Sequence, residues 1–359
     1  AGTYLAGLAP WEAAGSPLLA LTAAVLAGTV AVSLLALAGP WRRHRFGPPL
    51  TVLTLTLLTL VADVLTGSSL ELNGLLGYDA IVAGRFTGFG NLTFGLLAVS
   101  GLIGTAAAAT ALARRAGPSR ARAVTAVTVV GAGLLTVALV GAPGLGRDFG
   151  GVLAALPGYL LLAMLLTGIR VTVVRLGSVL ATAVLAGTAV AVLDWRRPPG
   201  ERTHLGRFVE QVRTGEAWTV VLRKAQANLD ILVGSPLAWL LPVAAVAAFW
   251  LLRPGGLLRR GRGTANAGPG VLPLAEVQVL RAALVACLLT LAVGAAVNDS
   301  GVAVPATAGA LLVPLLVWLA AGPGRGDTGE TAGRSPRSGP GEPTGRVTVV
   351  SRGSTVSST

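Results

Sequence analysis

Long apolar stretches alternate with short polar connections along most of this sequence. Stretches such as 17–39, 92–113 and 303–321 contain no charged residue, and each has about the 20 residues that a helix needs to cross the hydrocarbon core of a membrane. The same pattern predicts about nine spans, at 17–39, 50–66, 92–113, 124–142, 152–169, 176–194, 236–252, 277–297 and 303–321. We therefore expect an all-α fold, a multi-pass transmembrane helical bundle.

Composition supports a membrane protein and argues against a nucleic-acid-binding one. The chain is 53% hydrophobic and 12% charged, whereas soluble domains carry about 25% charged residues. The alternating ten-residue segments of a transmembrane barrel are not visible. The net charge of +13 comes from arginines in short clusters between apolar stretches, without the interleaved aromatic residues of single-strand binders. Lys224 is the single lysine, and this bias, with abundant Ala, Leu, Val and Gly, is typical of a GC-rich bacterium of the actinobacterial type.

The distribution of arginine predicts the orientation. Cytoplasmic connections of membrane proteins collect Lys and Arg. The arginines cluster in alternate connections, at Arg42, Arg43 and Arg45; Arg114, Arg115, Arg120 and Arg122; Arg170 and Arg175; and Arg253, Arg259, Arg260 and Arg262. We therefore expect the N-terminus outside and the C-terminus inside a bacterial plasma membrane. The basic connection 195–235 falls on the outer side and is the weakest point of this topology.

Two parts of the chain do not follow the pattern of spans. Residues 203–234 predict two interfacial helices, because Leu205, Phe208, Val209 and Val212 recur at helical spacing and leave a polar face. Such helices lie among lipid headgroups and attract their phosphates. Residues 322–359 are rich in Gly, Pro, Ser, Thr and Arg and predict a disordered cytoplasmic tail. The expected organisation is thus a polytopic domain over 1–321 followed by this tail.

Cysteine and histidine chemistry is scarce in this sequence. Cys287 is the single cysteine and lies in an apolar stretch, so no disulfide or thiolate cluster is available. The two histidines are His44 and His204. The chain begins at Ala1 without a methionine or a basic leader, and we expect either a processed protein or the C-terminal part of a longer one.

The predicted topology places the specific polar residues on the outer side. The candidate catalytic carboxylates are Asp63, Asp148 and Asp299, and the candidate substrate-binding residues are Arg85, Asn91, Asn298, Ser300, His204, Arg207 and Lys224. Asp63 falls near the end of a span, where an unpaired carboxylate costs about 2.5–3.5 kcal/mol. We predict that Asp63, Arg85, Asp148 and Asp299 meet in one outward-facing polar cavity.

Each of these residues also has a structural interpretation. Asp148, beside Arg147, is compatible with a helix cap or a solvated pair, and Asn298-Asp299-Ser300 with a capped hairpin turn. The glycines between Gly74 and Gly90 suit either a tight turn or backbone amides that approach an anion. His204 is either a proton carrier or a surface residue. The sequence leaves these alternatives open.

Several of these segments resemble those of one protein group. Gly77-Tyr78-Asp79, Gly84-Arg85-Phe86, Gly88-Phe89-Gly90-Asn91, Asp148-Phe149-Gly150-Gly151 and Asn298-Asp299-Ser300-Gly301 resemble segments of a group of bacterial polytopic membrane proteins. Some members of that group carry an extracytoplasmic domain similar to alkaline phosphatases. The resemblance spans roughly residues 50–321. It implies where the site lies and implies no reaction.

Three functions fit these observations. The first is an enzyme that acts on a lipid-linked, phosphate-bearing substrate of the polyprenyl type in envelope glycan assembly. It needs a carboxylate and cations that pair with phosphate, and a divalent cation is the cofactor that such chemistry suggests. The second is a transporter or flippase, although few polar residues fall within the spans and no repeat is visible. The third is a non-catalytic membrane anchor or partner of an extracytoplasmic hydrolase.

Overall fold

The described part of the protein is helical. The computed structural model describes residues 2–72, 74, 88–142, 144–202, 204–234, 246, 274–298 and 300–321, and these contain no β-strand. The first half comprises α1 (Gly2–Ala6), η1 (Trp11–Ala13), α2 (Pro17–Ala38), η2 (Pro40–Arg43), α3 (Gly47–Leu65), α5 (Asn91–Ala116) and α6 (Pro118–Gly141). The second half comprises α7 (Phe149–Leu166), α8 (Val173–Trp195), η3 (Pro199–Glu201), α9 (His204–Arg213), α10 (Ala217–Gly234), α12 (Leu274–Val297) and α13 (Ala303–Ala321).

The described helices confirm a multi-pass integral membrane protein. Seven of them, α2, α3, α5, α6, α7, α8 and α12, are long and apolar enough to cross a membrane. The apolar helix α13 coincides with the last expected span. Apart from Val246, the span expected at 236–252 lies outside the described residues, as does the tail expected at 322–359. The count of nine spans and the orientation therefore stay predictions.

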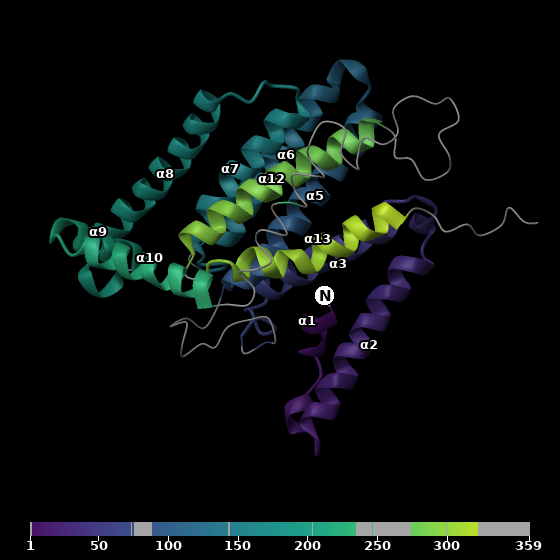
Figure 1. Cartoon of the computed structure of the whole chain (residues 1–359), viewed down its shortest axis with the longest axis horizontal. Coiled ribbons are helices and arrows are strands. Elements are labelled where there is room, and N and C mark those ends of the chain that lie inside the picture. Colours follow the sequence, from purple (N-terminus) through teal and green to yellow (C-terminus); the bar gives the residue numbers. More distant parts are fainter. Residues whose placement is uncertain are drawn as a thin grey trace, which may run out of the picture. The chain divides into compact units, whose positions relative to one another are not determined.

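Helix α5 is the central element of the bundle. It packs against α3, α6, α12 and α13, while α7 packs against α6, α8 and α12 (Figure 1). More than half of the apolar stretch of α5 is buried by protein, with Phe94, Val99 and Leu102 fully enclosed. Helices α2 and α8 bury little of their surface. The core thus lies around α5 and α7, and α2 and α8 are left to face lipid.

Small residues allow the central helices to approach closely. The Tyr159 ring of α7 packs against Gly133 of α6, where a Cβ atom would lie 2.8 Å from Tyr159 Cβ. The Tyr159 hydroxyl lies against Gly101 of α5 and accepts a hydrogen bond from Thr136 Oγ1 at 3.0 Å. Close approach of helix backbones at small residues is a common source of packing energy in membranes. Gly101 thus allows Tyr159 of α7 to approach α5 closely.

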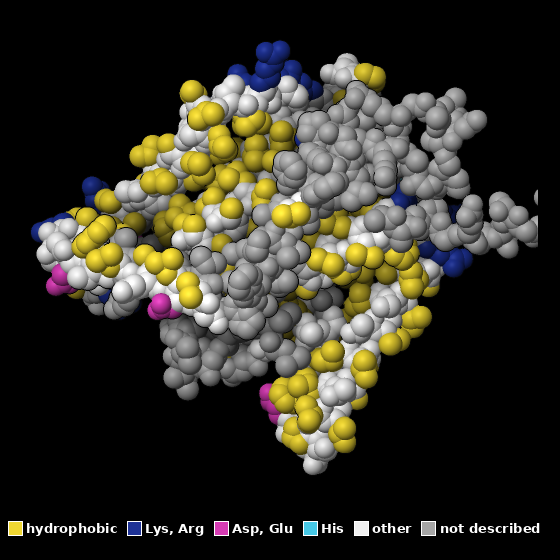
Figure 2. Space-filling model, in the orientation of Figure 1, with side chains coloured by type: hydrophobic (Ala, Val, Ile, Leu, Met, Phe, Trp, Pro, Cys, Tyr) yellow, Lys and Arg dark blue, Asp and Glu magenta, His cyan; other side chains and the backbone are white. Residues whose placement is uncertain are grey.

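Apolar side chains cover the outer surface of the described helices (Figure 2). Leu34 of α2, Leu134 of α6, and Leu185 and Leu193 of α8 are each more than half exposed. In water such a surface would favour aggregation, whereas in a bilayer it contacts lipid chains at no cost. Lys and Arg side chains gather toward helix ends in the same view. This distribution implies contact between the helices and membrane lipids.

The basic connection before α3 packs against the end of α13. Arg45 donates a hydrogen bond from its guanidinium to the backbone oxygen of Leu319, and Trp318 Nε1 donates to the backbone oxygen of Arg45 at 2.8 Å. His44 lies 3.5 Å from Glu276 at the start of α12. The connections that carry the predicted site leave the opposite ends of the same helices. The bundle therefore separates a basic end from a polar end.

Candidate functional site

The short segment Gly88–Asn91, which leads into α5, is the structural hub of the polar end. Four contacts join it to other segments. Gly88 N donates to Ser68 Oγ at 3.0 Å, Phe89 N to Gly146 O at 2.8 Å, Gly90 N to Glu71 Oε1 at 2.7 Å, and Asn91 Nδ2 to Ser300 Oγ at 2.8 Å. The hub thus ties the connections after α3, after α6 and after α12 to the start of α5.

The hub requires glycine at its first position. Gly88 has a φ of +109°, a backbone conformation that side chains disfavour. A Cβ atom there would lie 2.3 Å from the backbone oxygen of Gly146. The amides of Gly88, Phe89 and Gly90 all donate to protein acceptors. They are therefore occupied by the fold, which favours the tight-turn interpretation over an anion-binding one for these three residues.

Asp63 organises the turn that follows α3. Its Oδ1 accepts from Leu70 N at 2.8 Å and its Oδ2 from Glu71 N at 3.1 Å. Its side chain is buried, with 5% of its surface exposed. A buried carboxylate is tolerated when donors satisfy both of its oxygens. The partner expected for Asp63 is thus the backbone of its own turn, and both of its oxygens are used.

Glu71 is the residue of this end that the sequence analysis missed. It is 1% exposed and accepts hydrogen bonds from Gly90 N, from the Tyr4 hydroxyl and from Thr93 Oγ1. The one signal in the sequence is its position between Leu70 and Leu72, since a lone acid between leucines tends to be buried with a partner. Its partners come from distant segments, so no local motif in the sequence predicts them.

Asp148 and Asn298 lie at the first turn of α7. Asp148 is the N-cap of α7, and its Oδ1 accepts from Gly151 N at 2.9 Å. Asn298 is buried, and a Cβ atom on Gly150 would lie 1.8 Å from its Oδ1. The connection between α12 and α13 therefore contacts the first turn of α7 through Asn298 and the start of α5 through Ser300. The geometry supports the capping interpretation of Asp148.

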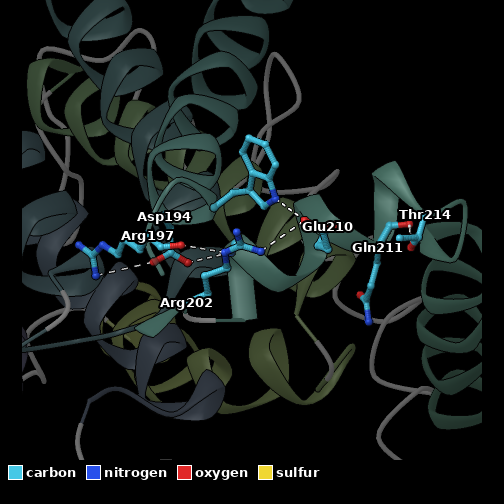
Figure 3. Close-up of polar contacts among 8 residues, drawn as sticks. Asp194, Arg197, Arg202, Glu210, Gln211 and Thr214 are labelled. Atoms are coloured by element: carbon cyan, nitrogen blue, oxygen red, sulfur yellow. Dashed lines mark hydrogen bonds and ion pairs between the residues drawn. The ribbon is translucent and has the colours of Figure 1, made fainter. Parts of the chain in front are cut away.

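The corner between α8 and α9 holds a second group of charged residues (Figure 3). Asp194 at the end of α8 accepts from Gly206 N at 2.8 Å and lies 3.7 Å from Arg197. Glu210 of α9 accepts from Trp195 Nε1 and from Arg202 Nη1 at 3.3 Å. In Figure 3, Arg202 lies between Asp194 and Glu210. These contacts fix α9 to the end of α8.

Cation–π contacts complete this corner. The guanidinium carbons of Arg202 and Arg213 lie 5.6 Å and 5.2 Å from the Trp195 ring centroid, within the range of a favourable cation–π contact. Arg207 is exposed and lines a hollow of about 310 Å³ together with Arg202, Glu210 and Gln211. The two helices expected within 203–234 are confirmed as α9 and α10.

Two of the main candidates lie outside the described residues. Arg85 falls in the gap before the hub, and Asp299 falls between the described residues Asn298 and Ser300. The side chains of His204 and Lys224 are also outside the description, although both residues belong to described helices. The predicted meeting of Asp63, Arg85, Asp148 and Asp299 therefore stays a prediction. The structure brings together Asn91 and Ser300 among the predicted substrate-binding residues.

Burial raises the pKa of the Glu71 carboxyl to about 7, and Asp63 adds to this rise, while hydrogen bonds from Thr93, Gly90 and Tyr4 oppose it. The pKa of Tyr4 is also raised, mainly by burial and by the neighbouring Glu71. For Glu210 the pKa is lowered, chiefly because Trp195 donates a hydrogen bond to it.

In the described part of the chain, no three His, Cys, Asp or Glu side chains come together as a metal site requires.

Comparisons with known proteins assign neither a family nor a fold to this chain. No family model matches the sequence, and no significant match was found among characterised proteins or solved structures.

Proposed function

We propose that this integral membrane protein binds and acts on a lipid-linked, phosphate-bearing substrate of the polyprenyl type in envelope glycan assembly. The observation that carries the proposal is the hydrogen bond from Asn91 Nδ2 to Ser300 Oγ. It joins the segment that follows the Arg85 loop to the hairpin that contains Asp299. An arginine and a carboxylate on adjoining segments are what phosphate recognition and activation of an acceptor require.

The proposed roles follow from the chemistry of each side chain. Arg85 pairs with the phosphate through its planar guanidinium. Asp299 serves as a general base toward an acceptor hydroxyl or as a ligand of a divalent cation. Asn91, Asn298 and Ser300 supply hydrogen bonds to the substrate. Asp63 and Asp148 bind backbone amides, so we assign them to the frame of the site and not to the reaction.

Access for a lipid is supported by α9 and α10. The exposed apolar side chains of α10 are Trp218, Leu222, Leu229 and Val233, which recur at helical spacing. Phe208 and Val212 form a similar exposed pair on α9. Helices of this kind lie in the headgroup layer, where Arg207 and Lys224 attract phosphates. In this proposal the membrane is the plasma membrane and the polar end faces outward.

The test is native mass spectrometry of the purified protein in mild detergent with added polyprenyl phosphate. We expect the wild type to retain the lipid and both Asp299→Ala and Arg85→Ala to release it. Arg120→Ala is the matched control, because it removes an exposed arginine from the opposite end of the bundle. Binding that all three variants retain would overturn the proposal, as would equal loss in the Arg120 variant.

A non-catalytic membrane anchor or hydrolase partner is the second candidate. It is favoured by the capping contacts of Asp63 and Asp148, which give two of the three candidate carboxylates a structural task. This candidate predicts that Asp299→Ala and Arg85→Ala leave lipid binding unchanged. The same mass-spectrometric experiment therefore separates the two functions.

A further inference from the structure

Glu71 lies at the junction of three elements that are far apart in the sequence. Tyr4 belongs to α1, Glu71 to the turn after α3, and Thr93 to the first turn of α5. The Tyr4 hydroxyl donates to Glu71 Oε2 at 3.1 Å, and Thr93 Oγ1 lies 2.6 Å from both carboxyl oxygens. A direct hydrogen bond between the Tyr4 and Thr93 hydroxyls closes the triangle. All three side chains are at least 97% buried.

This junction fastens α1, together with α2, to the rest of the bundle. Helix α1 packs closely on α2, where a Cβ atom on Gly28 would lie 2.9 Å from the backbone oxygen of Gly2. Helix α2 otherwise buries little of its surface, and among the described long helices its main partner is α3. The contacts of Tyr4 with Glu71 and Thr93 are the polar contacts that hold α1 to α3 and α5 in the described residues.

The triangle can hold one more proton without losing a hydrogen bond. Gly90 N is a fixed donor to Oε1, whereas the two hydroxyl protons rotate. When Glu71 is ionised, both hydroxyls donate to the carboxylate. When Glu71 is protonated, its O–H donates to Thr93 Oγ1, the Thr93 hydroxyl donates to the Tyr4 hydroxyl, and the Tyr4 hydroxyl still donates to Glu71. The contacts therefore suit both states of the carboxyl group.

The surroundings of Glu71 favour the protonated state. Among the described residues, the titratable groups that act on it from the packed elements are Tyr4 of α1 and Asp63 of α3. Neither supplies a positive charge that would stabilise the carboxylate. Burial is the main reason that the pKa of Glu71 rises to about 7, and Tyr4 of α1 lies directly against the carboxyl.

We propose that Glu71 is a proton-binding site that controls the docking of α1 against the turn after α3 and the start of α5. Proton uptake and docking are linked, because undocking exposes Glu71 to water and returns it to an ordinary carboxyl group. A fall in pH through the neutral range therefore strengthens the docking of α1, and a rise in pH weakens it. The ligand of the site is a proton, and the responding element is the N-terminal helix pair.

The test measures the accessibility of α1 with a thiol reagent. Ala6, 1% exposed in α1, is changed to Cys in a chain whose native Cys287 is replaced by Ala, and Leu8→Cys, at a position 70% exposed, is the reference. We expect the maleimide labelling rate at position 6, divided by that at position 8, to rise by about 30-fold between pH 5.5 and pH 8.5. The rise levels off above about pH 7.

Glu71→Gln is the decisive variant. Its amide can accept from Gly90 N and donate to the two hydroxyl oxygens, so it imitates the protonated state at every pH. We expect the labelling ratio of this variant to stay low and flat. A flat ratio in the wild type, or an equal rise in Glu71→Gln, would overturn the proposal. Amide hydrogen exchange of residues 2–8, compared between the same two proteins, gives a second readout that needs no introduced cysteine.

Discussion

Glu71, in the turn after α3, and Glu210, in the short helix α9, are both glutamates, yet their surroundings shift their pKa values in opposite directions. Glu71 is 1% exposed, and burial raises its pKa to about 7. The Glu210 side chain is 40% exposed, and donation from Trp195 together with nearby Arg213 and Arg202 lowers its pKa. Hydroxyls and an amide satisfy the first carboxyl, whereas a guanidinium and an indole satisfy the second.

This difference separates two kinds of polar structure in one membrane protein. The junction of α1, α3 and α5 is held by neutral donors in a dry environment, so its stability depends on the protonation state of Glu71. The corner of α8 and α9 includes the exposed charges of Arg197 and Glu210, so part of its stability depends on salt. Four measurements test this contrast, beginning with the largest expected effect.

Replacing Glu71 by Leu is expected to lower the free energy of unfolding by about 4 kcal/mol, because it leaves the Gly90 amide and one of the two hydroxyls without an acceptor, at roughly 1–3 kcal/mol each. Denaturant-induced unfolding in mixed micelles measures this. Glu210→Leu is the matched control, and we expect it to shift the midpoint less. Equal midpoints for the Glu71 variant and the wild type would contradict the assignment of Glu71 as a buried acceptor.

The pH dependence of stability follows from the raised pKa of Glu71. Between its ordinary pKa and about 7, the folded protein binds more protons at Glu71 than the unfolded chain does. Stability therefore falls as pH rises, by about 2 kcal/mol between pH 5.5 and pH 8. Thermal unfolding over this range measures the slope, and Glu71→Gln is expected to remove it. Glu210 behaves oppositely, since its contribution is present at neutral pH and is lost in acid as the carboxylate is protonated.

Asp63→Asn is expected to cost about 1.5 kcal/mol, because one of the two backbone amides that Asp63 binds loses its acceptor. Asp148→Asn should cost less, since Asn caps a helix about as well as Asp. Unfolding midpoints of the two variants, measured side by side, decide the order. A larger loss for Asp148 would show that its carboxylate does more than cap α7.

Glu210→Gln is expected to have the smallest effect. It weakens the contact with Arg202 but keeps an acceptor for Trp195 Nε1. We expect a lower melting temperature than wild type at low salt and no difference at high salt, because salt screens exposed ion pairs. A difference that persists at high salt would place this corner in the same class as the Glu71 junction.

The spans were predictable because each apolar stretch carries its own signal. Eight of the nine expected ranges coincide with described helices, such as 17–39 with α2 and 303–321 with α13, and the range 236–252 lies outside the described residues except for Val246. The two helices within 203–234 were predictable for the same reason, since amphipathic spacing is local. The cap formed by Asp148 was one of two interpretations that the sequence left open, and its geometry supports it.

The sequence by itself determined that the chain is helical and crosses a membrane, because hydrophobic length is a property of consecutive residues. Only the tertiary structure decided what the acids do. Tyr4 and Glu71 are 67 residues apart, and Asn91 and Ser300 are 209 apart. The pKa of Glu71 depends on burial by α1 and on donors from α5, so it exists only once these elements pack. The hydrophobic and polar pattern along the chain does not predict such contacts.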